Sequence, residues 1–202
     1  MHYLIVSFSH KNSTLAIREK LAFVDETAQI NAMRELNSHP CISESMVLST
    51  CNRVEIMCSC SDTESASNAL FGLLSRHCGL SAQELHERAD VFDDEGGIHH
   101  LFSVASSLDS MVVGETQISG QLKDAFKLSQ DNGFSAQKIA RAMSYAFKCA
   151  AEVRNATNIS SKPVSVASVA IAKVKESVGE VNGKKALVIG SGEMSVITCK
   201  HL

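Results

Sequence analysis

The pentapeptide at residues 49–53, Ser-Thr-Cys-Asn-Arg, carries the residue types needed for nucleophilic catalysis. Cys51 falls between two apolar runs that are typical of strands, and Arg53 follows it by two residues. A guanidinium creates local positive potential, which favours the thiolate, the nucleophilic form of cysteine. The pentapeptide alone favours a small buried cysteine at a strand end, because free cysteine is among the most buried residue types.

Two adjacent histidines, His99 and His100, offer an acid or base partner for a cysteine. On a helix His100 shares an apolar face with Val104 and Leu108. His99 points about 100° away from that face. His100 is therefore the candidate, and a hydrogen-bonded core histidine is the alternative. We expect no metal site, because adjacent histidines on a helix diverge and no third ligand is near in sequence.

Polar residues interrupt the apolar stretch at residues 108–118. Gly114 permits a turn that brings Glu115 and Gln117 toward Ser110. A carboxylate beside an amide would bind an α-ammonium group. Helix capping is the alternative, in which a side chain of this cluster accepts hydrogen bonds from the first amides of the next helix.

A basic face runs along the helix predicted at residues 135–156, formed by Lys138, Arg141, Tyr145 and Lys148. Cations around an aromatic ring are suited to contact a phosphate backbone. A solvated helix face is the alternative. The formal net charge of −3 opposes a general affinity for nucleic acid, so any such contact would depend on a local patch.

A glycine turn follows an apolar run near residue 190. The run at 186–189, Ala-Leu-Val-Ile, predicts a buried strand, and the turn after it is typical of dinucleotide-binding domains. On this motif alone, a dehydrogenase for small molecules is also open. The residue that would bind the ribose, about 20 positions later, falls beyond residue 202. The predicted cofactor-binding residues are Gly190, Ser191, Gly192, Glu193 and Met194.

Strands and helices alternate in the first half of the chain, and these elements must position the residues named above. Strands are predicted at 3–8, 45–50, 53–60 and 89–92, and helices at 14–37, broken near Asp25, and at 63–78, ended by Gly79. Helices alone follow at 97–108, 117–131, 135–156 and 165–178. The predicted class is α+β: a split βαβ, ferredoxin-like catalytic domain with a helical extension at 1–160, then the truncated start of a Rossmann-type α/β domain at 161–202.

Composition limits the class of protein. Hydrophobic residues make up 45% of the chain, enough for a sizeable core, so a disordered chain is not expected. Seven irregularly spaced cysteines indicate a reduced, cytoplasmic protein. No signal peptide is recognisable, and no apolar run approaches the ~18 residues needed to span a membrane.

Together these segments resemble glutamyl-tRNA reductase over most of the chain. The resemblance implies reduction of glutamyl-tRNA by NADPH to glutamate-1-semialdehyde, the first step of the five-carbon route to 5-aminolevulinate and tetrapyrroles. The motifs that carry it are STCNR-x-E at 49–55, HLF-x-VAS at 100–106, LDSMVVGE-x-QI-x-GQ-K at 108–123, EVRN-x-T-x-I at 152–159, VSVAS at 164–168 and LVIG-x-GEM at 187–194.

The resemblance assigns roles residue by residue. Cys51 would attack the ester carbonyl and form a thioester, and His100 would assist near the reacting centre. The glutamyl group would be held by Thr50, Arg53, Ser110, Glu115 and Gln117. Arg53 suits the side-chain carboxylate, because its guanidinium pairs bidentately, while Glu115 and Gln117 would face the ammonium group.

The resemblance also implies partners: glutamyl-tRNA, a second copy in a full-length homodimer, and the aminomutase that takes the semialdehyde. Two departures accompany it. Ser107 stands where the family usually has glycine, and the sequence stops at residue 202, inside the NADPH domain. We therefore expect thioester formation, followed by hydrolysis, from this chain alone. A non-catalytic module that binds tRNA or a partner, with Cys51 inert, is the alternative.

Overall fold

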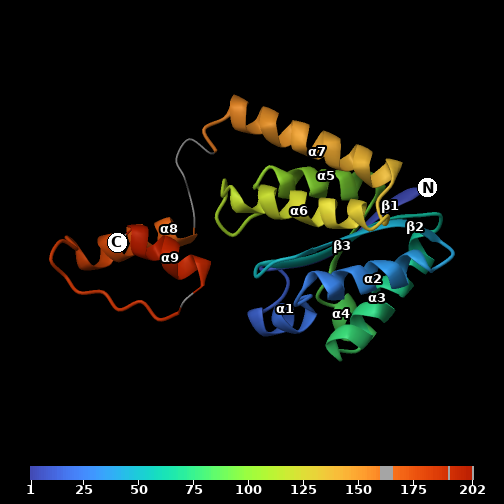
Figure 1. Cartoon of the computed structure of the whole chain (residues 1–202), viewed down its shortest axis with the longest axis horizontal. Coiled ribbons are helices and arrows are strands. Elements are labelled where there is room, and N and C mark those ends of the chain that lie inside the picture. The colour runs from blue at the N-terminus through green and yellow to red at the C-terminus, as the bar shows by residue number, and fades with distance from the viewer. Residues whose placement is uncertain (160–165, 191, 202) are drawn as a thin grey trace.

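A four-stranded sheet with helices on both faces forms the main body of the molecule (Figure 1). The computed structural model describes residues 1–159, 166–190 and 192–201. The strands are β1 (His2–Ser9), β2 (Ile42–Ser49), β3 (Arg53–Cys60) and β4 (Asp90–Asp93), in the order β2-β3-β1-β4. Neighbouring strands are antiparallel, so β1 and β2 run in the same direction with β3 between them. The prediction of four strands in the first half of the chain is confirmed.

Each face of the sheet builds its own core, because side chains alternate along the strands. Val6 and Ile56, which are partners in the β1–β3 register, face one layer of helices. Their neighbours Ile5 and Met57 face the other layer. The first layer contains α1 (Leu15–Leu21), α2 (Glu26–Asn37), α3 (Thr63–Cys78) and α4 (Ala82–His86), and the second contains α5 (Asp94–Ala105), α6 (Gln117–Asp131) and α7 (Gln137–Ala156) (Figure 1).

One end of the second face is polar. Ser7 and Ser9 of β1 pair in register with Glu55 and Arg53 of β3, and all four residues are buried. Buried polar groups require hydrogen-bond partners, so this end of the sheet must hold a polar network. It lies beside the β2–β3 turn that contains Cys51.

Local signals set several helix boundaries. The Asp25 carboxylate accepts a hydrogen bond from the Ala28 N–H at 2.8 Å and caps α2, at the break predicted near Asp25. Gly79 ends α3 with φ 73°, also as predicted. The sequence-based prediction omits α4, a five-residue helix, although Ser81 and Glu84 form a capping box at its start.

A side chain from β2 fixes the start of α7. The buried Glu44 carboxylate accepts hydrogen bonds from the N–H groups of Ala136, Lys138 and Ile139 at 2.8–3.0 Å. A carboxylate at a helix N-terminus pairs the free amides and complements the helix dipole. This 20-residue helix is the longest described element. Neither it nor another helix among the described residues has the length and apolarity needed to cross a membrane.

The predicted strand at 186–189 is wrong. Residues 184–190 form no strand, and Leu187 and Ile189 are 86% and 89% exposed. A strand is stable only when a neighbour pairs its backbone groups, and no strand among the described residues pairs with this one. The segment lies between α8 (Val166–Val178) and α9 (Glu193–His201), which contact each other. Ser191 and the side chains of Glu193 and Met194 lie outside the described residues.

Candidate active site

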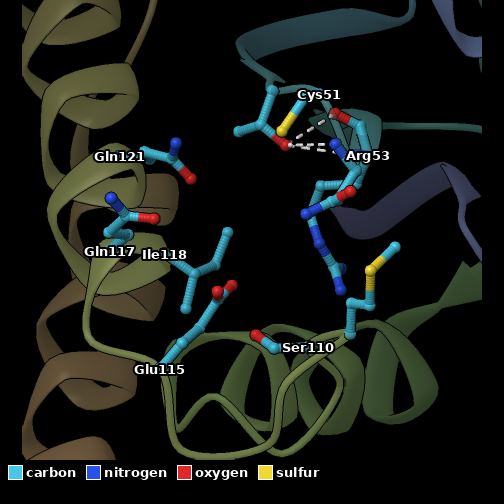
Figure 2. A pocket seen from close by; sticks show the side chains of 10 residues that line it. Cys51, Arg53, Ser110, Glu115, Gln117, Ile118 and Gln121 are labelled. Atoms are coloured by element: carbon cyan, nitrogen blue, oxygen red, sulfur yellow. Dashed lines mark hydrogen bonds between the residues drawn. The ribbon is translucent and has the colours of Figure 1, made fainter. Parts of the chain in front are cut away.

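Cys51 lies at the tip of the turn that joins β2 to β3 (Figure 2). The Thr50 N–H donates to the Arg53 carbonyl at 2.8 Å. The Thr50 hydroxyl oxygen accepts from the N–H groups of Asn52 and Arg53 at 3.3 and 3.1 Å. The Nε–H of Arg18 donates to the Cys51 carbonyl at 3.3 Å. The backbone of the turn is therefore held in place, while Cys51 itself is exposed.

A pocket of about 150 Å³ opens beside Cys51 (Figure 2). One wall is the β2–β3 turn, and the other is the loop between α5 and α6 together with the start of α6. Segments more than 50 residues apart in sequence therefore meet around one thiol. The lining includes all the predicted substrate-binding residues with the predicted nucleophile: Thr50, Cys51, Arg53, Ser110, Glu115 and Gln117.

Two of the buried residues in this pocket have polar side chains with no partner among the described residues. The Ser110 hydroxyl is buried and makes no hydrogen bond there. Glu115 is only 8% exposed, and its carboxylate makes no hydrogen bond or ion pair within the described residues. An unpartnered buried hydroxyl is costly, and its presence at a pocket favours a ligand that supplies the missing partner.

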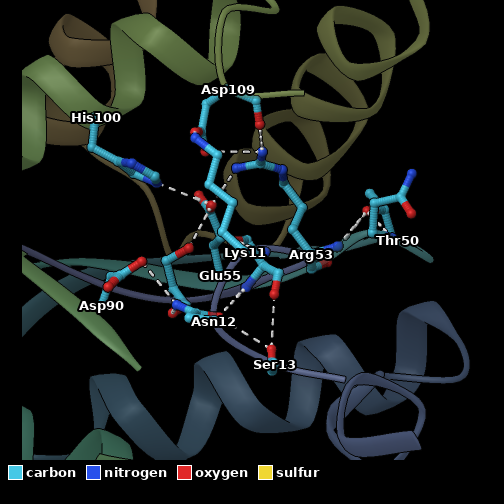
Figure 3. A network of polar contacts seen from close by, with 12 residues as sticks. Lys11, Asn12, Ser13, Thr50, Arg53, Glu55, Asp90, His100 and Asp109 are labelled. Atoms are coloured by element: carbon cyan, nitrogen blue, oxygen red, sulfur yellow. Dashed lines mark hydrogen bonds and ion pairs between the residues drawn. The ribbon is translucent and has the colours of Figure 1, made fainter. Parts of the chain in front are cut away.

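Arg53 forms the centre of a buried charge network behind the pocket (Figure 3). Its guanidinium donates to Glu55 Oε1 at 2.6 Å, to Asp109 Oδ2 at 3.1 Å and to the Asp109 carbonyl. Lys11 forms a further ion pair with Asp109. Burial favours the neutral form of Asp109, but hydrogen bonds and charges from Lys11 and Arg53 outweigh burial and lower the pKa of that carboxyl. The network contains two cations and two carboxylates, so its formal charges balance.

His100 belongs to this network and does not line the pocket. Its Nε2 lies 3.0 Å from Glu55 Oε1, and its ring stacks on Phe92 with centroids 4.2 Å apart. The same carboxylate oxygen accepts the Ser7 hydroxyl at 2.8 Å. The family resemblance implies a place for His100 near the reacting centre, but in the structure it reaches the pocket through Glu55 and Arg53. Its role in the reaction stays a prediction.

The loop between α5 and α6 is held by two residues with positive φ. Ser107 has φ 59°, and its hydroxyl donates to the Glu115 carbonyl at 2.5 Å. The Ser107 carbonyl accepts from the Gly114 N–H at 3.0 Å. Gly114 has φ 88°, and its backbone closely approaches the Ile159 carbonyl. These contacts close the loop on itself and fix the backbone that carries Ser110 and Glu115.

Replacing Gly114 by alanine is expected to destabilise the fold by about 2–3 kcal/mol. A Cβ there would lie 2.1 Å from the Ile159 oxygen, and the positive φ adds strain for any side chain. Gly120→Ala is the matched control, because Gly120 is helical and exposed with open space around it, so alanine should stabilise by about 0.5–1 kcal/mol. Urea denaturation compares them. Equal stability of the Gly114 variant and the unmodified protein would show that this close approach is unimportant.

Ser107 is expected to tolerate glycine better than alanine, which is unusual for a buried serine. Both substitutions remove the hydrogen bond to the Glu115 carbonyl. Alanine keeps the strained φ of 59°, so it should cost about 1–2 kcal/mol, whereas glycine relaxes the backbone and should be about 1 kcal/mol more stable than alanine. Thermal or urea unfolding measures the stability of both variants. A glycine variant that is less stable than the alanine variant would contradict this expectation.

Two residues at the site, Gln121 and Glu55, have no role predicted from the sequence. Gln121 lines the pocket from α6, and Figure 2 shows its side chain beside that of Gln117. A spacing of four residues on a predicted helix signals such a pair. Glu55 ends the STCNR-x-E motif, and its side chain contacts both Arg53 and His100. Its position two residues after Arg53, on the same face of a strand, could have indicated that contact.

Comparison with known proteins identifies the family of the chain. The family described as Glutamyl-tRNAGlu reductase, N-terminal domain, matches residues 6–157. The chain belongs to the glutamyl-tRNA reductase family. It is 64% identical to the glutamyl-tRNA reductase of Sulfurimonas denitrificans and 54% identical to that of Wolinella succinogenes, each over 202 residues. The alignments cover all of this chain and 47% and 46% of those proteins, so the chain spans about half the length of the curated relatives it matches.

A solved structure of a glutamyl-tRNA reductase has a similar fold. The enzyme from Methanopyrus kandleri superposes with a TM-score of 0.70 at 28% sequence identity. The match covers 98% of this chain and 46% of that chain. The mixed α/β architecture with its four-stranded antiparallel sheet is therefore that of a known oxidoreductase family.

Proposed function

We propose that residues 1–160 form the acyl-transfer domain of a glutamyl-tRNA reductase. The whole enzyme would reduce glutamyl-tRNA to glutamate-1-semialdehyde at the start of the five-carbon route to tetrapyrroles. The observation that carries the proposal is the exposed thiol of Cys51 at a pocket that also contains the unpartnered buried hydroxyl of Ser110 and the carboxylate of Glu115. The sheet order β2-β3-β1-β4 supports the ferredoxin-like assignment of this domain.

The pocket suits a glutamyl group because a carboxylate and a guanidinium lie on its opposite sides. Glu115 would pair with the α-ammonium group, with Gln117 beside it. Arg53 would bind the side-chain carboxylate on the other side. Its Nε–H has no partner among the described residues, while its other nitrogens hold Glu55 and Asp109. A substrate carboxylate would therefore join an existing network, and Ser110 would donate its free hydroxyl to the substrate.

The chemical step assigned to this domain is a transesterification. The Cys51 thiolate attacks the ester carbonyl carbon, a C–S bond forms, the C–O bond to the ribose breaks, and the ribose oxygen takes a proton. Thr50 keeps Cys51 at the tip of the turn through its bonds to Asn52 and Arg53. His100 would contribute by holding Glu55, which orients the Arg53 guanidinium.

Residues 161–202 would begin the NADPH-binding domain, and bound NADPH would supply the hydride that reduces the thioester. The turn before α9 fits a cofactor phosphate in one respect. Gly190 has φ 125°, and a Cβ there would lie 3.0 Å from the Ser195 hydroxyl oxygen, so a residue without a side chain suits this position. The backbone of Gly190 and Gly192, with the N-terminus of α9, would face the pyrophosphate.

The exposed face of α7 is the proposed contact for the tRNA backbone. Lys138, Arg141, Tyr145 and Lys148 are all exposed, and the Arg141 guanidinium carbon lies 5.9 Å from the centre of the Tyr145 ring. Cations beside an exposed aromatic ring suit phosphates and unstacked bases. The homodimer and the transfer of the semialdehyde to an aminomutase are proposed from the family resemblance alone.

Incubation of this 202-residue chain with glutamyl-tRNA and NADPH tests the proposal. We expect free glutamate and deacylated tRNA, because water would hydrolyse the thioester of Cys51. We expect little semialdehyde, because no strand among the described residues pairs with the segment before the glycine turn. Appreciable semialdehyde would contradict the expectation that this chain transfers the acyl group but does not reduce the thioester. Intact glutamyl-tRNA would contradict the acyl-transfer role itself.

Alkylation of Cys51 distinguishes a catalytic domain from a non-catalytic binding module. We expect iodoacetamide to label Cys51 selectively near neutral pH, and a glutamate ester analogue to protect it. The exposure of Cys51 beside the pocket favours this outcome over the module. An unreactive Cys51 in the folded protein would support the module instead.

A further inference from the structure

Arg18 of α1 is a buried arginine that contacts the turn carrying Cys51. Its Nε–H donates to the Cys51 carbonyl at 3.3 Å, and its Nη1 donates to the Ser13 carbonyl. The residue is only 7% exposed. Both acceptors are neutral peptide oxygens, so these hydrogen bonds position the guanidinium beside the turn without balancing its charge.

The charge of Arg18 has no counter-ion in the described part of the chain. The other cations near the turn are paired, Arg53 with Glu55 and Asp109, and Lys11 with Asp109. Arg18 forms no ion pair with any described carboxylate. A buried charge is costly unless it is paired, and a contact that only joined α1 to the turn would need no charge. The unpaired guanidinium therefore favours a negatively charged partner at this turn.

The nearby imidazole of His10 does not change this balance of charge. The His10 N–H donates to a carbonyl of the turn at 3.0 Å, and its Nδ1 is buried without a partner among the described residues. Burial lowers the pKa of its imidazole, and Arg53 lowers it further, against the opposing charge of Asp109. Lys11 and Arg18 act in the same direction as Arg53. A neutral imidazole adds no positive charge, so the excess at the turn belongs to Arg18.

The sulfur of Cys51 lies within reach of this charge. Covalent geometry keeps a cysteine sulfur within about 5 Å of the carbonyl oxygen of its own residue. Because Arg18 Nε is 3.3 Å from that oxygen, it lies within about 8 Å of the sulfur. This separation does not exceed the screening length of about 8 Å at physiological salt, and burial of Arg18 weakens the screening. Arg18 therefore stabilises a negative charge on the sulfur.

We propose that Arg18 is a positioning residue for acyl transfer, which holds the Cys51 peptide and stabilises the Cys51 thiolate by its charge, an inference that rests on the proposed function. As the thiolate attacks, the C–S bond forms and the C–O bond to the ribose breaks. The negative charge passes from the sulfur to the ribose oxygen, which takes a proton from water. Activation of the thiol and recognition of the glutamyl carboxylate would then use different guanidinium groups, those of Arg18 and Arg53.

Two alkylating reagents of different charge measure the potential at Cys51. Iodoacetate is an anion and iodoacetamide is neutral, and each forms a C–S bond with the thiolate and releases iodide. The ratio of their rates, followed by mass spectrometry of the Cys51 peptide, reports the charge beside the sulfur. A contact that only holds the backbone does not change this ratio. We expect Arg18→Gln to lower the ratio about threefold and to slow single-turnover acyl transfer from glutamyl-tRNA about tenfold. Arg18→Lys keeps the charge and should keep the ratio.

Thr14→Asp tests the charge without altering the buried side chain. Thr14 is exposed at the N-cap of α1, makes no capping hydrogen bond with its side chain, and follows Ser13, whose carbonyl accepts from Arg18. Aspartate suits an N-cap, so the variant should fold, and its carboxylate should lower the alkylation ratio about twofold.

Arg34→Gln is the matched control for the loss of a cation. Arg34 is exposed in the last turn of α2 and donates to Asn31 Oδ1, so its replacement should leave the alkylation ratio unchanged. A folded Arg18→Gln chain with the ratio of the unmodified chain, or an equal fall in Arg34→Gln, would overturn the proposal.

The outcome stays decisive if Arg18→Gln does not fold, because an unchanged ratio in Thr14→Asp would then overturn the proposal. Failure of the proposed function is distinguishable from this result. An unmodified chain that transfers no acyl group from glutamyl-tRNA would contradict the proposed function, whereas the alkylation ratio still decides whether Arg18 sets the charge at Cys51.

Discussion

Replacing Cys51 by serine is expected to lower the rate of acyl transfer from a glutamyl ester by on the order of a thousandfold or more. A serine hydroxyl is a poor nucleophile unless a base activates it, and His100 lies outside the pocket lining, held on Glu55. The exposed position of Cys51 makes folding insensitive to the change. The measurement is the release of deacylated tRNA under single-turnover conditions.

Cys199→Ser provides the control for this variant. Cys199 is the other exposed cysteine of the described residues, and it lies on α9, far along the chain from the β2–β3 turn. Its replacement should leave the rate within about twofold. A Cys51 variant that transfers the acyl group at the original rate would remove the thiol from the reaction, whatever the Cys199 variant does.

Replacing Glu55 by glutamine should destabilise the fold by about 2–4 kcal/mol and reduce acyl transfer about 10–100-fold. The Glu55 carboxylate is buried and pairs with Arg53, itself 2% exposed, and with His100. Loss of its charge leaves the guanidinium with Asp109 as its only remaining carboxylate partner among the described residues. Arg53 would then lose both stability and orientation. Urea denaturation and single-turnover acylation measure the two effects.

Glu35→Gln is the matched control for the loss of a carboxylate. Glu35 pairs with Arg76 on the surface, with both side chains more than half exposed, so its replacement should cost less than about 1 kcal/mol. Similar losses for the two variants would show that the buried network contributes no more than a surface pair. A stable Glu55 variant with lost activity would instead assign Glu55 to the reaction alone.

The same network predicts sensitivity to acid. Burial alone would raise the pKa of Glu55, but hydrogen bonds and charges from His100, Arg53 and Ser7 outweigh burial and lower it below its ordinary 4.5. A lowered folded-state pKa stabilises the fold above the unfolded value, and this contribution is lost as pH falls through the folded pKa. Stability should therefore decline below about pH 5, less steeply in the Glu55→Gln variant. Equal slopes would contradict this.

Much of the fold follows from local sequence signals. The bounds predicted for β3 and α6, 53–60 and 117–131, are those observed. Apolar periodicity and the breaks at Gly114 and Asn132-Gly133 define such elements without reference to the rest of the chain. The strand predicted at 186–189 failed because a strand, unlike a helix, requires a partner from elsewhere.

The residues that line the site could be predicted from the sequence, but the contacts between them could not. Thr50, Cys51 and Arg53 lie on one short turn, and their gathering with Ser110 and Glu115 could be expected from the family motifs. The hydrogen-bond partners of Arg53 could not be expected from the sequence, because they depend on which ends of β1, β3 and the α5–α6 loop meet in space. The place of His100 behind Arg53 has the same origin, since helical periodicity gives the direction of a side chain and not its contact.

The covalent intermediate itself is the most direct measurement. The chain is incubated with glutamyl-tRNA, quenched in acid to preserve a thioester, digested and examined by mass spectrometry. We expect a glutamyl mass increment on the peptide that contains Cys51, labile to hydroxylamine and absent in Cys51→Ser. An increment on another residue, or rapid deacylation of the tRNA with no covalent adduct at any time point, would contradict the assignment of Cys51 as the nucleophile.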